Sequence, residues 1–431
     1  MPSPHRAFRR AWLVTALATG LVAAVAAGCS SPPAPAGETE PAAQTGRTAQ
    51  ARDARAAAPS DPSGPVLAFA DARLAETADA LAPPAYPVRT NPDGTWLTKE
   101  PEDWTSGFFP AALWRVFERT QDPVWRERAE RWQAPLAPEA SHDDTDLGFK
   151  MFMTFAVDHE LTGDESAKQT ALAAADTLAA RFNPTVGMLR VWDDRDDEEK
   201  YQVNIDAVMN LELLYWAGQN GRPQYTDIAN RHANRTMTDL VRPDGSTFMF
   251  AGYDQRTGDL VRNYTEQGAR DDSTWARGQA WAAYGFAMAY RYTRDPRYLD
   301  TAHRTADWFL GHLPPDRVPY WDFSVPQAPP EPRDTSAAAV TASALLDMNT
   351  LDTDPGRKDA DVDGARGMLA SLSSPAYLSR DTPFRSVLLH GTQNLPTGQA
   401  DSGIMFGDYY FVEALSRWER QVGPSAQLTA G

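Results

Sequence analysis

Hydrophobic residues recur along the chain in long segments with helical spacing, and each segment is followed by an amphipathic one. Aromatic-rich apolar segments at residues 108–119, 147–161, 207–219 and 275–292 each run into a short polar turn. The turns end in Asp-Pro, Gly-Asp or Arg-Pro, and the amphipathic segments after them stop at a proline or a glycine. These signals predict a helical hairpin that repeats along the chain.

The amphipathic members of the four hairpins are residues 124–132, 167–182, 225–241 and 297–313. Two more hairpins pair residues 336–348 with 361–372, and residues 402–417 with an N-terminal helix at 67–82. Apolar helices suit an inner ring and amphipathic helices an outer one. Since no convincing series of alternating strands is found, the sequence predicts an all-α fold, an (α/α)6 barrel or six-hairpin toroid. An open solenoid is the alternative, although solenoid repeats are usually shorter and more even.

The N-terminal residues have the pattern of a targeting segment rather than of the folded domain. Three arginines within the first ten residues precede an apolar run at 11–27, which predicts a signal peptide at residues 1–29. Its ending resembles the lipobox of bacterial lipoproteins, with Cys29 as the lipidation site; a coincidental cysteine beside a cleaved signal is the alternative. Residues 30–64 are rich in Ala, Pro, Gly, Ser and Thr, which predicts a disordered linker. We therefore expect an exported lipoprotein, anchored to a membrane on the periplasmic side or at the cell surface.

Composition narrows the possible partners. The chain has 431 residues, a net charge of −17 and 42% hydrophobic residues, which is ample for a large catalytic domain over residues 65–431. The acidic balance argues against nucleic acid, and an anionic ligand would need local cations. Because Cys29 is the only cysteine, intrachain disulfides and cysteine metal clusters are excluded.

Each predicted apolar helix begins with polar or aromatic residues, and capping alone does not require them. An N-cap needs one small polar side chain, and Asp206, which directly precedes residues 207–219, can be explained as such a cap. The other helix starts carry more and larger groups, namely Trp104, Asp146, Arg277 with Trp281, Asp334, and Asp401 preceded by His390. In a closed ring these starts face one shared cavity, so the pattern predicts a pocket.

The chemistry of these residues indicates a site for an acidic sugar. Asp146 and Asp206 form a carboxylate pair, in which like charges raise the pKa of one member and supply an acid near neutral pH. Arg277 offers a planar fork suited to a carboxylate. Trp104, Trp192 and Trp281 offer flat faces for sugar rings or for a helical core. Paired carboxylates, aromatic rings and an anion-binding arginine indicate a hydrolase that acts on acidic sugars.

Other signals in the sequence are weak. Residues 252–259 fit a hairpin turn better than a calcium loop. Residues 352–363 carry several aspartates and are interpreted as a solvated loop and helix start rather than a metal site. The sequence contains no phosphate-binding glycine loop, zinc motif or nucleophile elbow.

Several motifs in fixed order resemble those of a known family. They read Trp104-Thr-Ser-Gly-Phe-Phe-Pro, Asp146-Leu-Gly-Phe, Asn204-Ile-Asp206-Ala-Val-Met-Asn-Leu, Trp275-Ala-Arg-Gly-Gln-Ala-Trp281 and Gly407-Asp-Tyr-Tyr-Phe-Val-Glu-Ala-Leu415. Between about residue 65 and about residue 420 the chain resembles the unsaturated glucuronyl hydrolases of glycoside hydrolase family 88. The related unsaturated rhamnogalacturonyl hydrolases are the nearest alternative.

The resemblance implies an (α/α)6 barrel that removes a 4,5-unsaturated uronic acid from the non-reducing end of lyase-generated oligosaccharides. The implied mechanism hydrates a vinyl ether, with Asp206 as the general acid/base and Asp146 as the supporting carboxylate. Substrate-contacting positions of the family match five residues here: Trp104, Trp192, Gln267, Arg277 and Trp281. The resemblance implies neither a metal nor an organic cofactor.

The chain departs from the family at two positions. Met249 and Glu266 stand where the family typically or often has His, and a methionine cannot donate a hydrogen bond. His390 is a candidate substrate-binding residue that compensates for Met249. A non-catalytic surface lipoprotein that binds acidic glycans on the same scaffold is therefore an alternative. An (α/α)6 lyase is another, but it would need a Tyr or His base that Asp206 does not supply. The sequence leaves the oligomeric state open.

Overall fold

The computed structural model describes residues 63–191 and 201–423, all within the second of two compact units, Ala57–Gly431. The predicted signal peptide, Cys29 and Trp192 lie outside the described residues, as does nearly all of the predicted linker, so these predictions remain untested. Among the described helices, none combines the length and the hydrophobicity that a membrane span requires.

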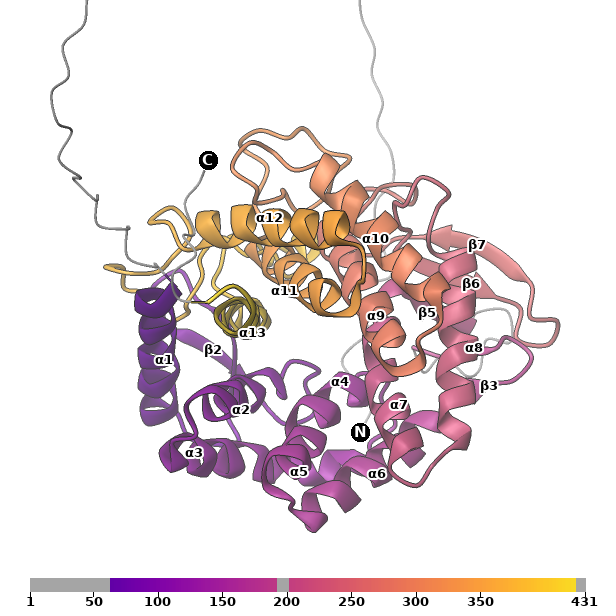
Figure 1. The fold of residues 1–431 in the computed structure, drawn as a ribbon, viewed down its shortest axis with the longest axis horizontal. Helices are drawn as coiled ribbons and strands as arrows, with labels where there is room; N and C mark the ends of the chain where they lie inside the picture. The colour runs from indigo at the N-terminus through magenta and orange to yellow at the C-terminus, as the bar shows by residue number, and fades with distance from the viewer. Residues whose placement is uncertain (1–62, 192–200, 424–431) are drawn as a thin grey trace, which may run out of the picture. The chain divides into compact units, whose positions relative to one another are not determined.

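Helices of the described residues form two concentric layers, as the sequence predicts (Figure 1). The inner layer consists of α2 (Phe108–Thr120), α4 (Leu147–Met151) with η3 (Phe152–Ala156) and α5 (Val157–Thr162), η4 (Ile205–Asn210) with α7 (Leu211–Gln219), α9 (Ala276–Thr293), α11 (Thr335–Leu351) and α13 (Met405–Val422). The outer layer consists of α1 (Ser63–Ala80), α3 (Pro123–Gln133), α6 (Glu165–Ala179), α8 (Gln224–Asp239), α10 (Pro296–Gly311) and α12 (Pro355–Leu372). The short η2 (Ala134–Ser141) follows α3, and η5 (Leu395–Thr397) precedes α13.

The inner helices close into a ring. Each packs against its neighbours in chain order, and α13 packs back onto α2, which excludes the open solenoid. The N-terminal α1 contacts α13, so the sixth hairpin pairs the two ends of the domain as predicted. Helix α9 is buried without interruption from Ala276 to Ala289, because an inner helix is covered both by the ring and by its outer partner. The fold is therefore the predicted (α/α)6 barrel.

The polar turns between hairpin members have a simple local cause. Asp122, Asp164 and Asp295 each accept a hydrogen bond from a free amide in the first turn of the outer helix that follows. Proline at the first position of α3 and α10 adds a residue whose fixed φ suits a helix start and whose missing N–H is not needed there. Helix α12 begins in the same way, with Asp354 before a proline.

Some predicted helices differ in detail from the observed ones. The apolar segment 147–161 is interrupted by η3, a turn with π-helical hydrogen bonding. Helix α12 begins at Pro355 rather than residue 361, because Asp354 supplies its cap. Residues 352–363 consist of a short loop at 352–354 and the start of α12, as predicted, but the helix begins earlier than expected. Asp361 lies buried, with His303 Nδ1 3.8 Å from its carboxylate.

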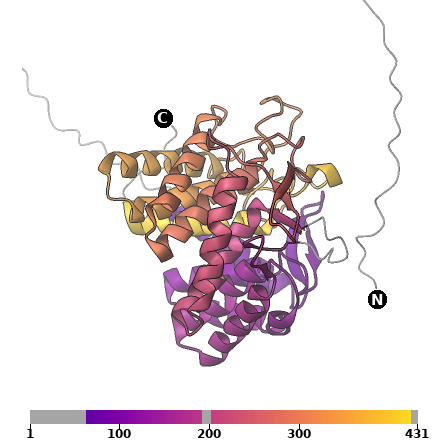
Figure 2. The same cartoon turned by 90° about the vertical axis from the view of Figure 1, so that its right-hand side faces the viewer.

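Short antiparallel strands lie between the helices, although the sequence shows no convincing series of strands. They are β1 (Tyr86–Thr90) with β2 (Trp96–Lys99), β3 (Phe182–Asn183) with β4 (Met188–Leu189), and a sheet of β5 (Tyr201–Asn204), β6 (Phe250–Tyr253) and β7 (Leu260–Tyr264). The turn joining β6 to β7 is the hairpin predicted at residues 252–259. Seen from the side, the strands gather at one side of the ring (Figure 2).

Candidate active site

Strand β5 and helix η4 place Asp206. Asn204, the last residue of β5, caps η4 by accepting a 3.0 Å hydrogen bond from the amide of Ala207. The amide of Ile205 donates to the carbonyl of Met249 at 2.8 Å and extends the pairing of β5 with β6. Asp206 is therefore not the helix cap, and it is the one residue of η4 that is only half-buried. The Asp206 carboxylate is therefore not used in capping η4.

The carboxyl group of Asp206 is poorly stabilised as an anion. Its Oδ1 is buried and has no hydrogen-bond partner within the described part of the chain. Burial raises the pKa of Asp206 to about 7, and the positive charge of Arg277 only partly opposes this effect. A carboxyl group with this pKa can donate or accept a proton near neutral pH.

Asp146 occupies the corresponding place before α4. Its side chain makes no capping hydrogen bond, and its Oδ1 instead accepts from Nδ2 of Asn210 at 3.2 Å. Burial and the negative charges of Asp144 and Asp206 raise the pKa of Asp146 to about 8, against the lowering effects of Asn210 and Lys150. Because Asp206 contributes to this shift, the structure brings the predicted carboxylate pair together.

Arg277 begins α9 and is 1% exposed. Its guanidinium donates to Oδ2 of Asp334 at 3.0 Å and to Oε1 of Gln267 at 2.9 Å. It also donates to the backbone carbonyls of Thr392 and Gln393. The arginine therefore joins three segments that are far apart in the sequence. These partners take up four of the five N–H groups of the guanidinium, and the direct carboxylate binding predicted for Arg277 remains a prediction.

The surroundings of Arg277 keep its charge close to Asp206. The rings of Trp275 and Phe406 lie against the guanidinium, with their centroids 4.4 and 5.1 Å from its central carbon. Burial in this setting lowers the pKa of Arg277, and Asp334 and Asp206 oppose the shift. Arg277 thus acts on Asp206 through its field, whether or not it contacts a ligand.

Aromatic rings line the neighbouring helix starts. Trp104 is half-buried and lies edge-on to Phe108 and Phe149, with centroids 6.1 and 6.2 Å away. Trp281 on α9 is 4% exposed and packs edge-on against Tyr410 at 5.3 Å. Trp104 thus retains an accessible surface, whereas Trp281 is almost entirely part of the core.

Met249 contacts the segment that carries Gln267. Its sulfur accepts from the amide of Gln267 and from the hydroxyl of Thr265, each at 3.3 Å, and the side chain is 4% exposed. The sulfur of Met249 is therefore a buried hydrogen-bond acceptor. It holds the backbone of the Gln267 segment and cannot donate a hydrogen bond to a ligand. Glu266, between these two contacts, is exposed.

His390 lies on the loop that also reaches Arg277. It has a positive φ of 59°, and its Nδ1 is 2.6 Å from Oδ1 of Asp401. Its ring stands edge-on to Tyr377. The structure thus gives His390 contacts with Asp401 and Tyr377, and the predicted compensation for Met249 remains a prediction.

Two polar residues near the carboxylates were not singled out from the sequence. Lys150, one helical turn after Asp146, is fully buried, and its ammonium donates to the carbonyls of Pro101 and Glu102, which hold the segment before Trp104. Asn210 links η4 to α4. In the sequence, the signal for Lys150 and Asn210 is a charged or amide side chain inside an otherwise apolar helix.

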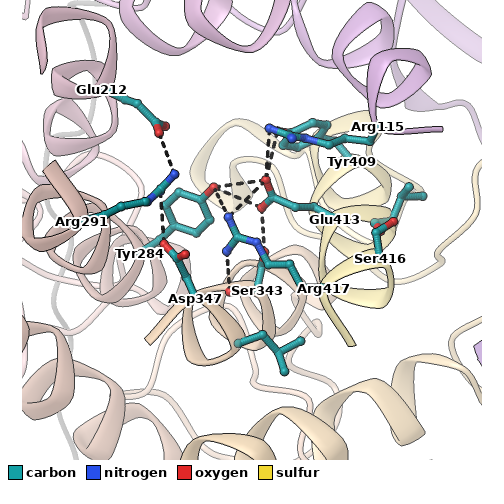
Figure 3. Close-up of polar contacts among 12 residues, drawn as sticks. Arg115, Glu212, Tyr284, Arg291, Ser343, Asp347, Tyr409, Glu413, Ser416 and Arg417 are labelled. Carbon is teal, nitrogen blue, oxygen red and sulfur yellow. Dashed lines mark hydrogen bonds and ion pairs between the residues drawn. The ribbon is translucent and has the colours of Figure 1, made fainter. Parts of the chain in front are cut away.

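A second group of buried charges lies farther along the same inner helices (Figure 3). Glu413 on α13 is 3.5 Å from Arg417 and 3.6 Å from Arg115, and it accepts hydrogen bonds from Ser343 at 2.6 Å and Tyr284 at 3.1 Å. Burial alone would raise the pKa of Glu413, but these partners, led by Arg417, lower it to about 2. This carboxylate stays ionised.

The same group continues across the ring. Arg291 on α9 is 3.2 Å from both Glu212 on α7 and Asp347 on α11 (Figure 3). Burial raises the pKa of Glu212 to about 7 despite Arg291. Within residues 63–191 and 201–423, no group of three His, Cys, Asp or Glu side chains is arranged to hold a metal ion.

Comparison with known proteins gives consistent matches. Residues 85–313 match the family described as Glycosyl Hydrolase Family 88. A Formosa agariphila protein named unsaturated glucuronyl hydrolase is 41% identical over 349 residues, which cover 77% of this chain and 86% of that protein. A Bacillus protein of the same name is 36% identical over 346 residues, which cover 78% of this chain and 92% of that protein. A solved structure of an unsaturated glucuronyl hydrolase specific for heparin shares 36% identity and a TM-score of 0.79, covering 83% of this chain and 97% of its own.

Proposed function

The chain belongs to glycosyl hydrolase family 88 and is a glycoside hydrolase, and we propose that it removes a 4,5-unsaturated uronic acid from oligosaccharides. The residue removed is the non-reducing-end unit that polysaccharide lyases leave behind. The observation that carries this proposal is the pair of half-buried carboxyls, Asp146 and Asp206, with pKa values raised into the neutral range at the helix starts.

The proposed reaction hydrates the C4=C5 double bond of the unsaturated sugar. Asp206, in its acid form, protonates C4, and the positive charge that develops is shared by C5 and the ring oxygen. The Asp206 carboxylate then takes a proton from water as the water oxygen bonds to C5. The resulting hemiketal opens by breaking the bond from C5 to the ring oxygen, and the glycosidic bond at C1 then breaks. Asp206 regains its proton and is ready for another cycle.

Asp146 and Arg277 support this chemistry through charge. Burial and the negative charge of Asp206 raise the pKa of Asp146, which keeps a proton in the pair near neutral pH. Arg277 supplies positive charge beside Asp206 in a chain whose net charge is −17. This local cation offsets the repulsion that an anionic sugar would otherwise meet. Trp104, with part of its ring accessible, is the aromatic face best placed for the sugar.

The reaction is tested by the loss of vinyl-ether absorbance with unsaturated disaccharides from hyaluronan, chondroitin, heparin, ulvan and pectin lyase digests. Wild type is compared with Asp206→Asn. Decay with wild type and none with the variant supports the proposal and identifies the glycan. Running the reaction in ¹⁸O-labelled water separates the mechanisms, since hydration places the label at C5 and ordinary glycoside hydrolysis places it at C1. Label at C1 would exclude the proposed mechanism.

A non-catalytic glycan-binding role is the second candidate, and Met249 favours it. A thioether there can neither donate a hydrogen bond nor carry charge to a sugar. Unchanged absorbance on every disaccharide, combined with measurable binding by calorimetry, would put this role first.

Export and lipid anchoring through Cys29 form a separate proposal, supported by the N-terminal residue pattern. Membrane fractionation of wild type and Cys29→Ala tests it. The variant is expected to leave the membrane fraction, and its retention there would argue against the anchor.

A further inference from the structure

Asn210 is a buried amide that connects the segments of both carboxyls. It ends η4, four residues after Asp206, and is 0% exposed. Its Nδ2 donates to Oδ1 of Asp146 at 3.2 Å, and its Oδ1 accepts from the amide of Phe149 at 3.0 Å. Helix α4 can approach this closely because Gly148 has no side chain; a Cβ there would lie 2.3 Å from the Asn210 Cα.

The contact with Phe149 fixes the orientation of the Asn210 amide. Phe149 lies in the first turn of α4, where backbone N–H groups lack helical acceptors, and the Asn210 oxygen serves one of them. The amide therefore turns its NH₂ group toward Asp146 and can only donate there. A donor favours the ionised form of Asp146, while Oδ1 of Asp206 has no such donor among the described residues.

Other charges around the pair leave the location of its proton finely balanced. Asp144 and Asp206 disfavour the charged form of Asp146, and Lys150 favours it. Arg277 favours the charged form of Asp206, and burial disfavours ionisation of both carboxyls. In a coupled pair of this kind, a single added hydrogen bond changes which member holds the shared proton.

We propose that Asn210 is a positioning residue whose hydrogen bond favours the ionised form of Asp146 and so makes the shared proton available to Asp206. The inference rests on the proposed function, in which Asp206 is the acid. Asn210 itself does not touch the reacting atoms. Its effect is to hold α4 against η4 and to bring the proton affinity of Asp146 closer to that of Asp206.

Two substitutions of Asn210 separate the hydrogen bond from the added charge. Asn210→Asp keeps an oxygen for the Phe149 amide but presents an acceptor to Asp146, whereas Asn210→Ala removes both contacts without adding charge. In each variant we expect kcat to fall by about tenfold or more and KM to change little, because Asp146 then holds the shared proton more tightly and Asp206 receives it less often. Both limbs of the kcat/KM profile should shift to higher pH, by about one unit in Asn210→Asp and less in Asn210→Ala.

Asn349→Asp is the matched control. Asn349 lies near the C-terminal end of α11 and donates one hydrogen bond to Gln421. This substitution should leave the pH profile of kcat/KM unchanged. If Asn210→Asp does not fold, as judged by thermal melting, Asn210→Ala carries the test. An Asn210→Ala profile whose limbs coincide with wild type, whatever its kcat, would overturn the inference. Asp206→Asn is measured in the same assay. If Asp206→Asn is inactive, the proposed function stands even when the inference about Asn210 fails. If Asp206→Asn is active, both the proposed function and the inference about Asn210 are wrong.

Discussion

Asp206 and Glu413 are both carboxylic acids on the inner ring, yet their surroundings have opposite effects. Glu413 lies among Arg115, Arg417, Ser343 and Tyr284, and its pKa is lowered to about 2. Oδ1 of Asp206 has no hydrogen-bond partner among residues 63–191 and 201–423, and burial raises the pKa of this carboxyl to about 7. Burial raises the pKa of both, so the neighbouring positive charges and hydrogen-bond donors decide which carboxyl can exchange a proton near neutral pH.

The contrast also shows that a raised pKa does not by itself mark an active site. Glu212 and Asp361 have pKa values raised by burial to about 7 and about 8, but Glu212 lies beside Arg291 and Asp361 lies between two outer helices. What distinguishes Asp206 is its place at a helix start beside a second such carboxyl, Asp146. The predictions below test this distinction.

The largest expected effect is on catalysis. Asp206→Asn should lower kcat by roughly 10²–10⁴-fold, since it removes the proton donor to C4. Asp361→Asn is the matched control, because it removes a buried carboxyl of raised pKa outside the site, and it should leave kcat unchanged. Steady-state rates on the disaccharide that wild type consumes provide the measurement. Equal losses in both variants would mean that the pair at the helix starts has no special role.

The next effect is on stability. Glu413→Gln should lower the free energy of unfolding by about 3–5 kcal/mol, because it leaves Arg417 buried without its counter-ion and removes one of the two carboxylates beside Arg115. Asp206→Asn should leave the unfolding free energy at pH 7 unchanged or raise it. Urea unfolding followed by circular dichroism measures both. A Glu413→Gln protein as stable as wild type would remove the contrast between the two regions.

A smaller effect concerns the pH dependence of stability. Because the pKa of Asp206 is raised on folding, its favourable contribution is present below about pH 4 and is lost as pH rises through about 7. The pKa of Glu413 is lowered on folding, so its contribution is present above about pH 4 and is lost as pH falls toward 2. Unfolding of wild type and Asp206→Asn from pH 4 to 8 should therefore diverge by up to about 4 kcal/mol, with wild type losing more stability. Parallel curves would place the Asp206 pKa near its ordinary value.

The smallest effect is expected at Met249. Met249→Leu keeps the volume but removes the sulfur that accepts from Gln267 and Thr265. We expect KM to rise by about two- to fivefold with kcat unchanged, since a weak hydrogen bond that positions Gln267 is lost. Met368→Leu, at a fully buried site on α12, is the control for the loss of a buried thioether. A similar KM change in both variants would contradict a role for the sulfur.

Most of the fold follows from periodicity and capping in the sequence. The Asp-Pro turns that predict hairpin joints are, in the structure, N-caps with proline at the first helical position. The apolar inner helices predict the ring, and its closure through α13 and α2 agrees with that prediction. The short strands were missed because β5 and β6 are four residues each, too few for a clear alternation.

The sequence placed three charged site residues at helix starts, but it showed few of their contacts, and the roles predicted for them remain predictions. Sequence reasoning placed Asp146, Asp206 and Arg277 at one end of the ring, since all three stand at starts of inner helices. It could not show that Arg277 already binds Asp334 and Gln267, because those pairs depend on loops that periodicity does not describe. Asn210 was missed for a related reason: a buried amide shows its role only when its partner across the helix interface is known.

The most direct test of the contrast between Asp206 and Glu413 is a carbon-13 NMR titration of their side-chain carboxyl groups. Asp206→Asn and Glu413→Gln would assign the two resonances in protein labelled at aspartate and glutamate. We expect the Asp206 signal to titrate near pH 7, while the Glu413 carboxylate stays ionised down to the acid limit of the folded protein. An Asp206 signal that titrates near pH 4, together with the exposed aspartates, would contradict the proposed acid.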